Sequence, residues 1–213
     1  MREVEVKLRV HGLFKLPDLV TAEVGVARAK RQVTRNLAAI YYDTQDLRLF
    51  RWGVTLRRRE GGNDAGWHLK LPVKGVDSGI RDELQLPLDA GQAGHIPDAL
   101  SGVILPYTRG RALQPIAEVH TERIPYLLYS DGGTALAEMV DDRVSIFDDG
   151  VVVERYREIE VEALVEDADL TQIIAELERV GANRSSLSKA ASALGPDAGG
   201  PADVREPAIV GPL

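Results

Sequence analysis

Residues 2–10 alternate without a break between charged and apolar side chains, and no other feature constrains the fold of this chain as strongly. The two-residue period is that of a β-strand with one apolar face and one ionic face. The apolar face would carry Val4, Val6, Leu8 and Val10, and the ionic face Glu3, Glu5, Lys7 and Arg9. Carboxylates two residues apart on a strand lie about 7 Å apart and can share a divalent cation. An isolated strand of this kind is more often a solvated sheet face, so the rest of the chain must decide.

The composition is that of a globular protein with one domain, or one domain and a tail. The chain has 213 residues, of which 44% are hydrophobic and 28% charged. A net charge of −7 argues against a general nucleic-acid binder, which needs a basic surface. The absence of cysteine excludes disulfides, zinc–thiolate sites and thiol nucleophiles. No membrane-length apolar run and no signal-peptide pattern are present, so we expect a cytoplasmic protein without a membrane partner.

Most of the chain has the pattern of β-strands joined by short turns. Strands are predicted at 2–10, 33–42, 54–60, 66–73, 80–87, 117–129, 134–146 and 151–164. The Gly- and Asp-rich turns at 131–133 and 148–150 are typical of hairpins. A short helix is expected within 88–115, and an amphipathic helix at 169–181. The segment 195–213 is rich in Gly and Pro and is predicted to be a flexible tail or linker.

The charged faces of these strands are sorted by sign. The first and last strands carry carboxylates, whereas the strands between them carry Arg and Lys. A merely solvated sheet would more often mix the two signs on each strand. If the sheet closes into a barrel, its ionic face needs water, metal and a charged ligand inside. A polyanion bound by Arg and Lys, with divalent cations on the carboxylates, meets that requirement.

Several segments resemble one family. The run Glu3-Val4-Glu5-Val6-Lys7 has the ExExK form of the CYTH domain, the signature of the triphosphate tunnel metalloenzymes. Segments 41–44, 55–59, 67–70, 81–84, 158–162 and 186–189 also resemble this family, in its order. The resemblance covers residues 2 to about 192 and implies a CYTH domain at 1–194, followed by the tail at 195–213. It implies a mainly β (α+β) fold: an eight-stranded antiparallel closed β-barrel, the triphosphate tunnel, with a few peripheral helices.

The resemblance also implies roles for individual residues. The metal, Mg²⁺ or Mn²⁺, would be bound by Glu3, Glu5, Asp142, Glu160 and Glu162. The substrate would contact Lys7, Arg57, Arg59, Lys70, Arg81, Arg123 and Lys189, and the catalytic residues would be Glu5, Lys7, Arg59 and Lys189. Alternation favours Asp142 over Asp141, because Asp142 shares the face of Glu138. Two positions stay open. Glu158 fits either the tunnel face or the outer surface, and His68 could face the tunnel because it lies on the same side of its strand as Lys70.

The sequence therefore predicts metal-dependent hydrolysis of a triphosphate, with inorganic triphosphate favoured because the motifs offer charge but no evident nucleobase or thiazole pocket. Thiamine triphosphatase and adenylate cyclase are alternatives on the same fold, and a non-catalytic polyphosphate-binding module is an alternative of another class. The paired carboxylates favour catalysis, since a polyanion holder would gain affinity by losing them. The ligand would be a small-molecule triphosphate or short polyphosphate, with no nucleic acid and no membrane partner. Similarity to bacterial CYTH domains that precede a CHAD domain implies a fused CHAD domain, in a monomer or homodimer.

Overall fold

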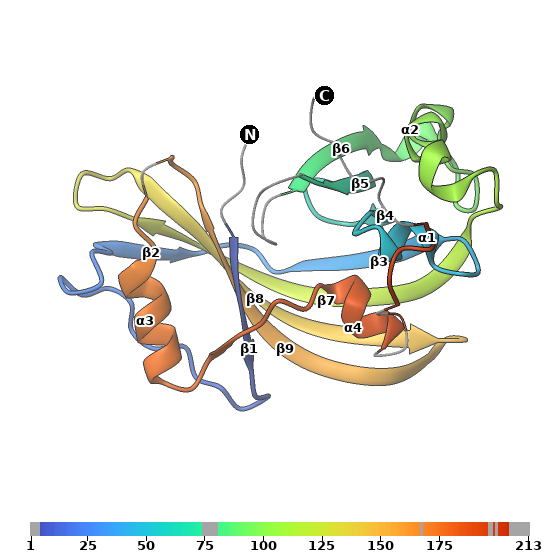
Figure 1. The fold of residues 1–213 in the computed structure, drawn as a ribbon. Helices are drawn as coiled ribbons and strands as arrows, with labels where there is room; N and C mark the ends of the chain where they lie inside the picture. The colour runs from blue at the N-terminus through green and yellow to red at the C-terminus, as the bar shows by residue number, and fades with distance from the viewer. Residues whose placement is uncertain (1–4, 74–80, 167, 196–197, 199, 205–213) are drawn as a thin grey trace, which may run out of the picture.

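The computed structural model describes residues 5–73, 81–166, 168–195, 198 and 200–204, and within them the fold is one curved antiparallel sheet with short helices at its margins (Figure 1). The strands are β1 (Glu5–Val10), β2 (Arg28–Arg31), β3 (Arg35–Asp43), β4 (Thr55–Glu60), β5 (Gly66–Pro72), β6 (Arg81–Pro87), β7 (Gln114–Tyr129), β8 (Ala135–Asp148), β9 (Val151–Ala163) and β10 (Asn183–Arg184). The helices are α1 (Arg48–Arg51), α2 (Asp98–Thr108), α3 (Thr171–Arg179) and α4 (Lys189–Leu194), with a 3₁₀ turn at Leu88–Ala90. The two predicted helices correspond to α2 and α3.

The sheet is not the closed eight-stranded barrel that the sequence predicted. Its order is β10-β1-β9-β8-β7-β3-β4-β5-β6, and β2 pairs with β7. Among the described residues, the second edge of β1 pairs with β10 and not with β6, so no hydrogen-bonded ladder closes the sheet. The prediction was therefore wrong both in the number of strands, which is ten, and in the closure. The two additional strands, β2 and β10, are too short to show an alternating pattern.

The long strands β7, β8 and β9 form the base of the molecule and are joined by tight hairpins. Asp148 pairs with Val151, which leaves a two-residue loop at Asp149 and Gly150. Both residues have positive φ, 46° and 77°, as a hairpin turn with the right-handed twist of the strands requires. These hairpins keep consecutive strands adjacent, so that alternate residues of all three share the concave face.

The two larger apolar clusters of the sheet lie on its convex side. One core cluster joins β1, β7, β8 and β9 to α3 and includes Leu8, Leu128, Met139, Ile159, Val161, Ile173 and Leu177. A second joins β3, β4 and β5 to α2 and includes Tyr42, Leu56, Trp67, Leu69, Leu100 and Ile104. Each fully buried side chain of this size contributes about 1.5–3 kcal/mol of transfer free energy. Helices α2 and α3 thus cover the convex side. Helix α4 packs on the concave side, where its Ala190 joins a third apolar cluster beside the ionic residues, made of Ala39, Tyr41, Val119, Val144 and Ile146.

The described part of the segment predicted as a tail lies against the helices that flank β4. The indole Nε1 of Trp52 donates to Asp203 at 3.1 Å, and Arg48 lies 3.4 Å from the same carboxylate. Asp203 also pairs with Arg109. The remainder of the predicted tail, 205–213, lies outside the described residues. Among the helices that the structure describes, none has the length and apolar character needed to cross a membrane.

Candidate functional site: a charged cavity on the concave face

A cavity of about 440 Å³ occupies the concave side of the sheet. Strands β1 and β3 to β9 and the segment before α4 line it, because alternate residues of each strand point inward. Its ionisable Asp, Glu, Lys and Arg lining comprises Glu5, Lys7, Arg57, Arg59, Asp64, Lys70, Arg81, Glu83, Arg123, Glu138, Glu160, Glu162 and Lys189. Most carboxylates come from β1, β8 and β9, whereas β4, β5 and β6 supply most of the cations. The concave face thus gathers most of the residues that the sequence singled out.

Three carboxylates form a row across neighbouring strands on the concave face. Glu162 on β9 lies directly opposite Glu5 on β1 and directly opposite Glu138 on β8. Residues opposite each other in an antiparallel pair have Cβ atoms about 5 Å apart. Burial and the nearby Glu160 raise the pKa of Glu5, while Lys7, whose Nζ lies 3.3 Å from Glu5, opposes that change. Glu3, the other predicted metal ligand of β1, lies outside the described residues.

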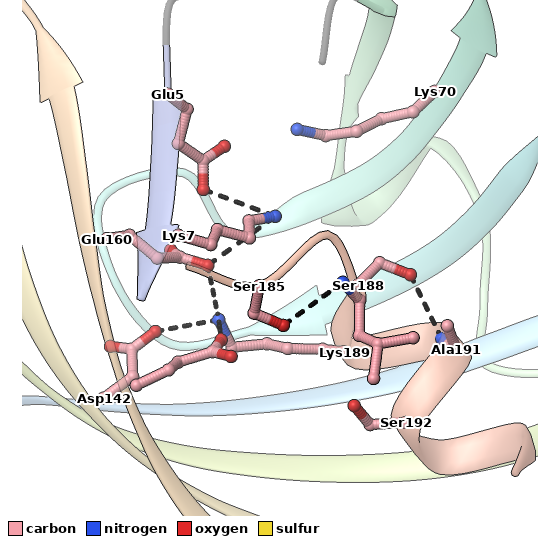
Figure 2. Close-up of polar contacts among 12 residues, drawn as sticks. Glu5, Lys7, Lys70, Asp142, Glu160, Ser185, Ser188, Lys189, Ala191 and Ser192 are labelled. Atoms are coloured by element: carbon pink, nitrogen blue, oxygen red, sulfur yellow. Dashed lines mark hydrogen bonds and ion pairs between the residues drawn. The ribbon is translucent and has the colours of Figure 1, made fainter. Parts of the chain in front are cut away.

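Below this row, the ammonium group of Lys189 sits among three buried carboxylates (Figure 2). Its Nζ lies 2.5 Å from Glu158, 2.8 Å from Glu160 and 2.9 Å from Asp142. Burial alone would lower the pKa of Lys189, but the three carboxylates outweigh it and hold that pKa well above its usual value. Lys189 therefore stays charged; it donates a hydrogen bond to Glu160 at 2.8 Å and forms ion pairs with Asp142 and Glu158.

Arg123 completes this buried cluster from β7. Its Nε and one terminal nitrogen donate to the two oxygens of Asp142 at 2.8 and 2.6 Å, and that nitrogen also donates to Glu160 at 2.8 Å. A bidentate arginine–carboxylate pair is among the strongest of protein hydrogen-bonded contacts. Burial lowers the pKa of Arg123, but the bonds and charge of Asp142 and Glu160 more than compensate and raise it. Two cations thus balance most of the charge of three carboxylates.

The structure separates the two neighbouring aspartates. Asp142 is fully buried among cations on the concave side. Asp141 points to the opposite face, where both of its oxygens accept hydrogen bonds from Arg157 at 2.7 Å. The strand alternation that favoured Asp142 thus agrees with the geometry. Glu158, which the sequence left open, is 1% exposed and belongs to the buried cluster.

The carboxylates also suit a hard divalent ion. One oxygen each from Asp142, Glu158 and Glu160 lie within 4.8 Å of one another, and oxygen-only ligand sets fit Mg²⁺ or Mn²⁺. The ammonium of Lys189 lies at this position, so an ion there would compete with it. Glu5 and Glu162 lie beside Glu160 toward the cavity opening. Among the described residues, Asp142, Glu158 and Glu160 are the three carboxylates whose oxygens lie close enough together to share one ion.

The opposite wall is cationic and ends in a tight turn. Arg57 and Arg59 on β4 and Lys70 on β5 face the cavity. Burial, and then repulsion by Arg57 and Arg123, lower the pKa of Arg59 to about 9. Arg59 is paired with Asp64, and Gly61 in the connecting turn has a φ of 79°. A Cβ atom at Gly61 would lie 2.1 Å from the carbonyl oxygen of Asn36, so the turn requires glycine here.

His68 is a buried member of this wall. Its Nε2 contacts the carbonyl oxygen of Asp64 at 2.8 Å, and its Nδ1 contacts Glu83 at 2.6 Å. Because a carbonyl only accepts, Nε2 donates, and a proton must also lie between Nδ1 and the carboxylate. Although burial opposes it, this bond and the charge of Lys70 lower the pKa of Glu83 to about 2. His68 thus ties the turn at Asp64 to the strand that carries Glu83.

Several lining residues were not singled out from the sequence. The charged ones include Asp64 and Glu138, and the neutral ones include Tyr41, Thr121, Gln85, Ser185, Ser186 and Ser188. Residues an even number of positions apart on a strand share one face. This rule could have identified Glu138 from Asp142, and could have assigned Glu158 to the concave face from Glu160. The serines lie in an irregular segment before α4, where no periodicity predicts the direction of a side chain.

The chain is thus a mainly β protein whose curved antiparallel sheet encloses a cavity with carboxylates on one wall and cations on the other. The CYTH domain model matches residues 1–193, and the chain belongs to this family. An acidic cluster that could hold a divalent ion agrees with the metal dependence of that family.

Two sequence relatives match part of the chain, and two solved structures share its fold. Two uncharacterized proteins from strains of Mycobacterium tuberculosis are each 40% identical to this chain over 154 residues, which is 67% of the chain but 29% of the relative's length. A putative adenylyl cyclase from Hippeastrum, described as having a dominant triphosphatase activity, matches with a TM-score of 0.53 and 16% identity over 91% of this chain and 95% of its own. A putative adenylate cyclase from Bacillus halodurans matches with a TM-score of 0.51 and 22% identity over 84% of this chain and 89% of its own.

Proposed function

We propose that this chain is a divalent-metal-dependent triphosphatase that converts inorganic triphosphate to pyrophosphate and phosphate. The observation that carries the proposal is the division of one cavity into a carboxylate wall and a cationic wall. Tyr41 is the one phenylalanine, tyrosine or tryptophan in the described lining, which gives little surface for stacking a nucleobase or thiazole ring. A small and highly charged substrate without an aromatic group fits this lining best.

The two walls of the cavity would have different roles, one in metal binding and the other in phosphate binding. Glu5, Glu160 and Glu162, with Glu3 and Asp142, would hold Mg²⁺ or Mn²⁺, which supplies positive charge to the phosphate oxygens. Lys7, Arg57, Arg59, Lys70, Arg81, Arg123 and Lys189 would supply the fixed positive charge of the phosphate path. Charge that builds up on the equatorial oxygens during phosphoryl transfer is stabilised best by cations already held in place. Arg59 and Lys7 lie on opposite walls of the cavity and would contact the substrate from two sides.

The solved structures support a triphosphate as the substrate and keep one alternative open. The Hippeastrum protein is described by its triphosphatase activity, and both neighbours are called putative adenylyl or adenylate cyclases. Adenylate cyclase activity is therefore the second candidate. Phosphate release from inorganic triphosphate, ATP and thiamine triphosphate, each with Mg²⁺ and Mn²⁺, tests the proposal. Cyclic AMP from ATP without hydrolysis of inorganic triphosphate would refute it.

The sequence relatives are much longer than this chain. The chain spans about 29% of the length of the Mycobacterium tuberculosis proteins that it matches. A CHAD domain beyond the CYTH domain remains a prediction from the sequence resemblance.

Triphosphate should raise the thermal stability of the protein in the presence of Ca²⁺, used as a divalent ion that does not support turnover. After burial, repulsion by Arg57 and Arg123 lowers the pKa of Arg59, and an anionic ligand that cancels this repulsion binds only the folded state. At a hundredfold excess over its dissociation constant it should add about 2.7 kcal/mol to the free energy of unfolding. Differential scanning calorimetry with triphosphate and with orthophosphate measures this. Equal effects of the two anions would indicate general screening and contradict a built triphosphate site.

Arg57→Ala should raise the KM for triphosphate with a smaller effect on kcat. Arg57 lines the cavity and contacts Tyr41 at 3.5 Å, so its guanidinium would bind phosphate before and during the reaction. A charged hydrogen bond contributes about 1.5–3 kcal/mol, which corresponds to roughly a 10- to 150-fold change. Steady-state kinetics measure it, with Arg143→Ala on the outer face as the matched control. An unchanged KM in Arg57→Ala would place this residue outside the phosphate path.

A further inference from the structure

The most basic segment of this acidic chain lies outside the cavity. Residues 28–35 contain four cations, Arg28, Lys30, Arg31 and Arg35, and no carboxylate, although the whole chain has a net charge of −7. All four residues of β2 are exposed. In the part of the chain that the structure describes, no ion pair is formed by Arg28, Lys30 or Arg35. These charges are therefore available to a partner.

The strand register places three of these cations on the side of the cavity. Arg35 on β3 lies opposite Arg123, which lines the cavity. Farther along β7, Lys30 lies opposite Leu127 and Arg28 opposite Tyr129. Leu128, between them, is fully buried in the core under α3, so its two neighbours point to the other face, which is the concave one.

A side-chain contact supports this orientation. The guanidinium of Arg28 stacks over the ring of Tyr129, 4.2 Å from its centroid. We call Arg28, Lys30 and Arg35 the basic strip. It starts beside Arg123 and runs along β7 to Tyr129, six residues away, which is about 20 Å of extended strand. That is farther than a triphosphate inside the cavity can reach.

The charge on this face favours an anion. Glu138 lies opposite Leu127, in the row of Lys30, and Asp142 lies opposite Arg123, in the row of Arg35. Asp142 is already paired with Arg123 and Lys189, so Glu138 is the carboxylate of these rows that opposes the three cations, and the strip stays positive. Exposed edge strands often carry Lys and Arg to prevent aggregation, and β2 is such an edge. Edge protection alone, however, does not require the cations to lie on the face of the cavity and to begin beside Arg123, one of its lining residues.

We propose that the basic strip is a docking site for the part of a linear inorganic polyphosphate that extends beyond the cavity. A chain end would occupy the cavity, and the following phosphates would lie along β2 and β7. The strip would then add affinity for long chains and none for triphosphate. This inference rests on the proposed function, because it uses the cavity as the place where the chain end binds.

The test compares how one variant binds a short and a longer polyphosphate. Arg28→Gln/Lys30→Gln removes two strip charges and leaves Arg35, which adjoins the cavity, in place. Binding of triphosphate and of a medium-length polyphosphate is measured by calorimetry with Ca²⁺ at several salt concentrations. For the long chain we expect about tenfold weaker binding at low salt, and a slope of log affinity against log salt that is shallower by about 1 to 2, since each lost phosphate contact removes roughly 0.7 to 0.9. Triphosphate binding should stay within about twofold.

The control is Arg143→Gln/Arg179→Gln, which removes the same charge from exposed positions on β8 and α3. An equal loss in the control, an equal loss for both chain lengths, or no loss for the long chain would overturn the proposal. Single-stranded RNA is a further probe. If RNA binds wild type as tightly as polyphosphate and loses that affinity in the strip variant, the strip is a nucleic-acid surface and the proposal is wrong. Triphosphate hydrolysis by wild type tests the proposed function separately, so the two failures are distinguishable.

Discussion

Glu5→Gln is expected to lower the turnover of inorganic triphosphate by at least about 100-fold without loss of the fold. Glu5 lies on the open side of the carboxylate wall, opposite Glu162, and belongs to no apolar cluster of the core. The substitution keeps the shape of the side chain but removes one negative charge from the metal-binding face. The bound metal would stabilise the transition state by several kcal/mol, and losing that stabilisation would slow turnover this much, since each 1.36 kcal/mol of activation free energy changes the rate tenfold.

Three measurements on this variant are needed. Phosphate release at saturating Mg²⁺ gives the rate, Mn²⁺ titration followed by calorimetry gives metal affinity, and thermal unfolding gives stability. Asp82→Asn is the matched control, because Asp82 is an exposed carboxylate of β6 outside the cavity lining. A Glu5→Gln variant that keeps wild-type turnover at saturating Mg²⁺ would refute the assignment of Glu5 to the metal.

Lys189→Met is expected to destabilise the protein without any ligand, by about 3–5 kcal/mol at neutral pH. The substitution leaves Asp142, Glu158 and Glu160 buried with only Arg123 to balance them. Removing one partner from a buried ionic group costs far more than an exposed substitution, because the remaining charges keep their desolvation penalty. A lysine that only bound substrate phosphate would leave the stability of the free protein unchanged.

The pH dependence of this effect has a definite sign. In the wild type, burial raises the pKa of Glu160, but Lys189, Arg123 and Lys7 outweigh it and hold this pKa well below 4.5. The resulting stability is present above pH 4.5 and is lost as the pH falls through the depressed pKa. Without Lys189 that contribution is smaller, so the difference between variant and wild type should narrow in acid.

Chemical denaturation at several pH values measures both effects. Lys30→Met, which removes an exposed lysine, is the control and should stay within about 0.5 kcal/mol of wild type. Adding Glu158→Gln to Lys189→Met removes one uncompensated carboxylate and should restore part of the stability. Wild-type stability in Lys189→Met would show that the buried cluster does not depend on its ammonium.

The sequence alone determined most of the strands and the face on which each charged residue lies. The eight predicted strands correspond to β1 and β3 to β9, because the apolar and charged alternation of a half-buried strand is a local property. The same alternation placed Lys7, Arg57, Lys70 and Glu160 together on one face. It favoured Asp142 over Asp141 for the same reason, since a shift of one residue reverses the side-chain direction.

The tertiary structure decided which strands pair at the edges and how the charges meet. Whether β1 pairs with β10 or with β6 depends on segments far apart in the chain, and two-residue β10 has no pattern of its own. The sequence assigned Lys189 to the substrate, a role that stays a prediction, and gave no sign of the three carboxylates around its ammonium. That contact exists only when β8 and β9 come together with α4. Strand periodicity determines the direction of a side chain, but the partners that it meets depend on packing between distant elements.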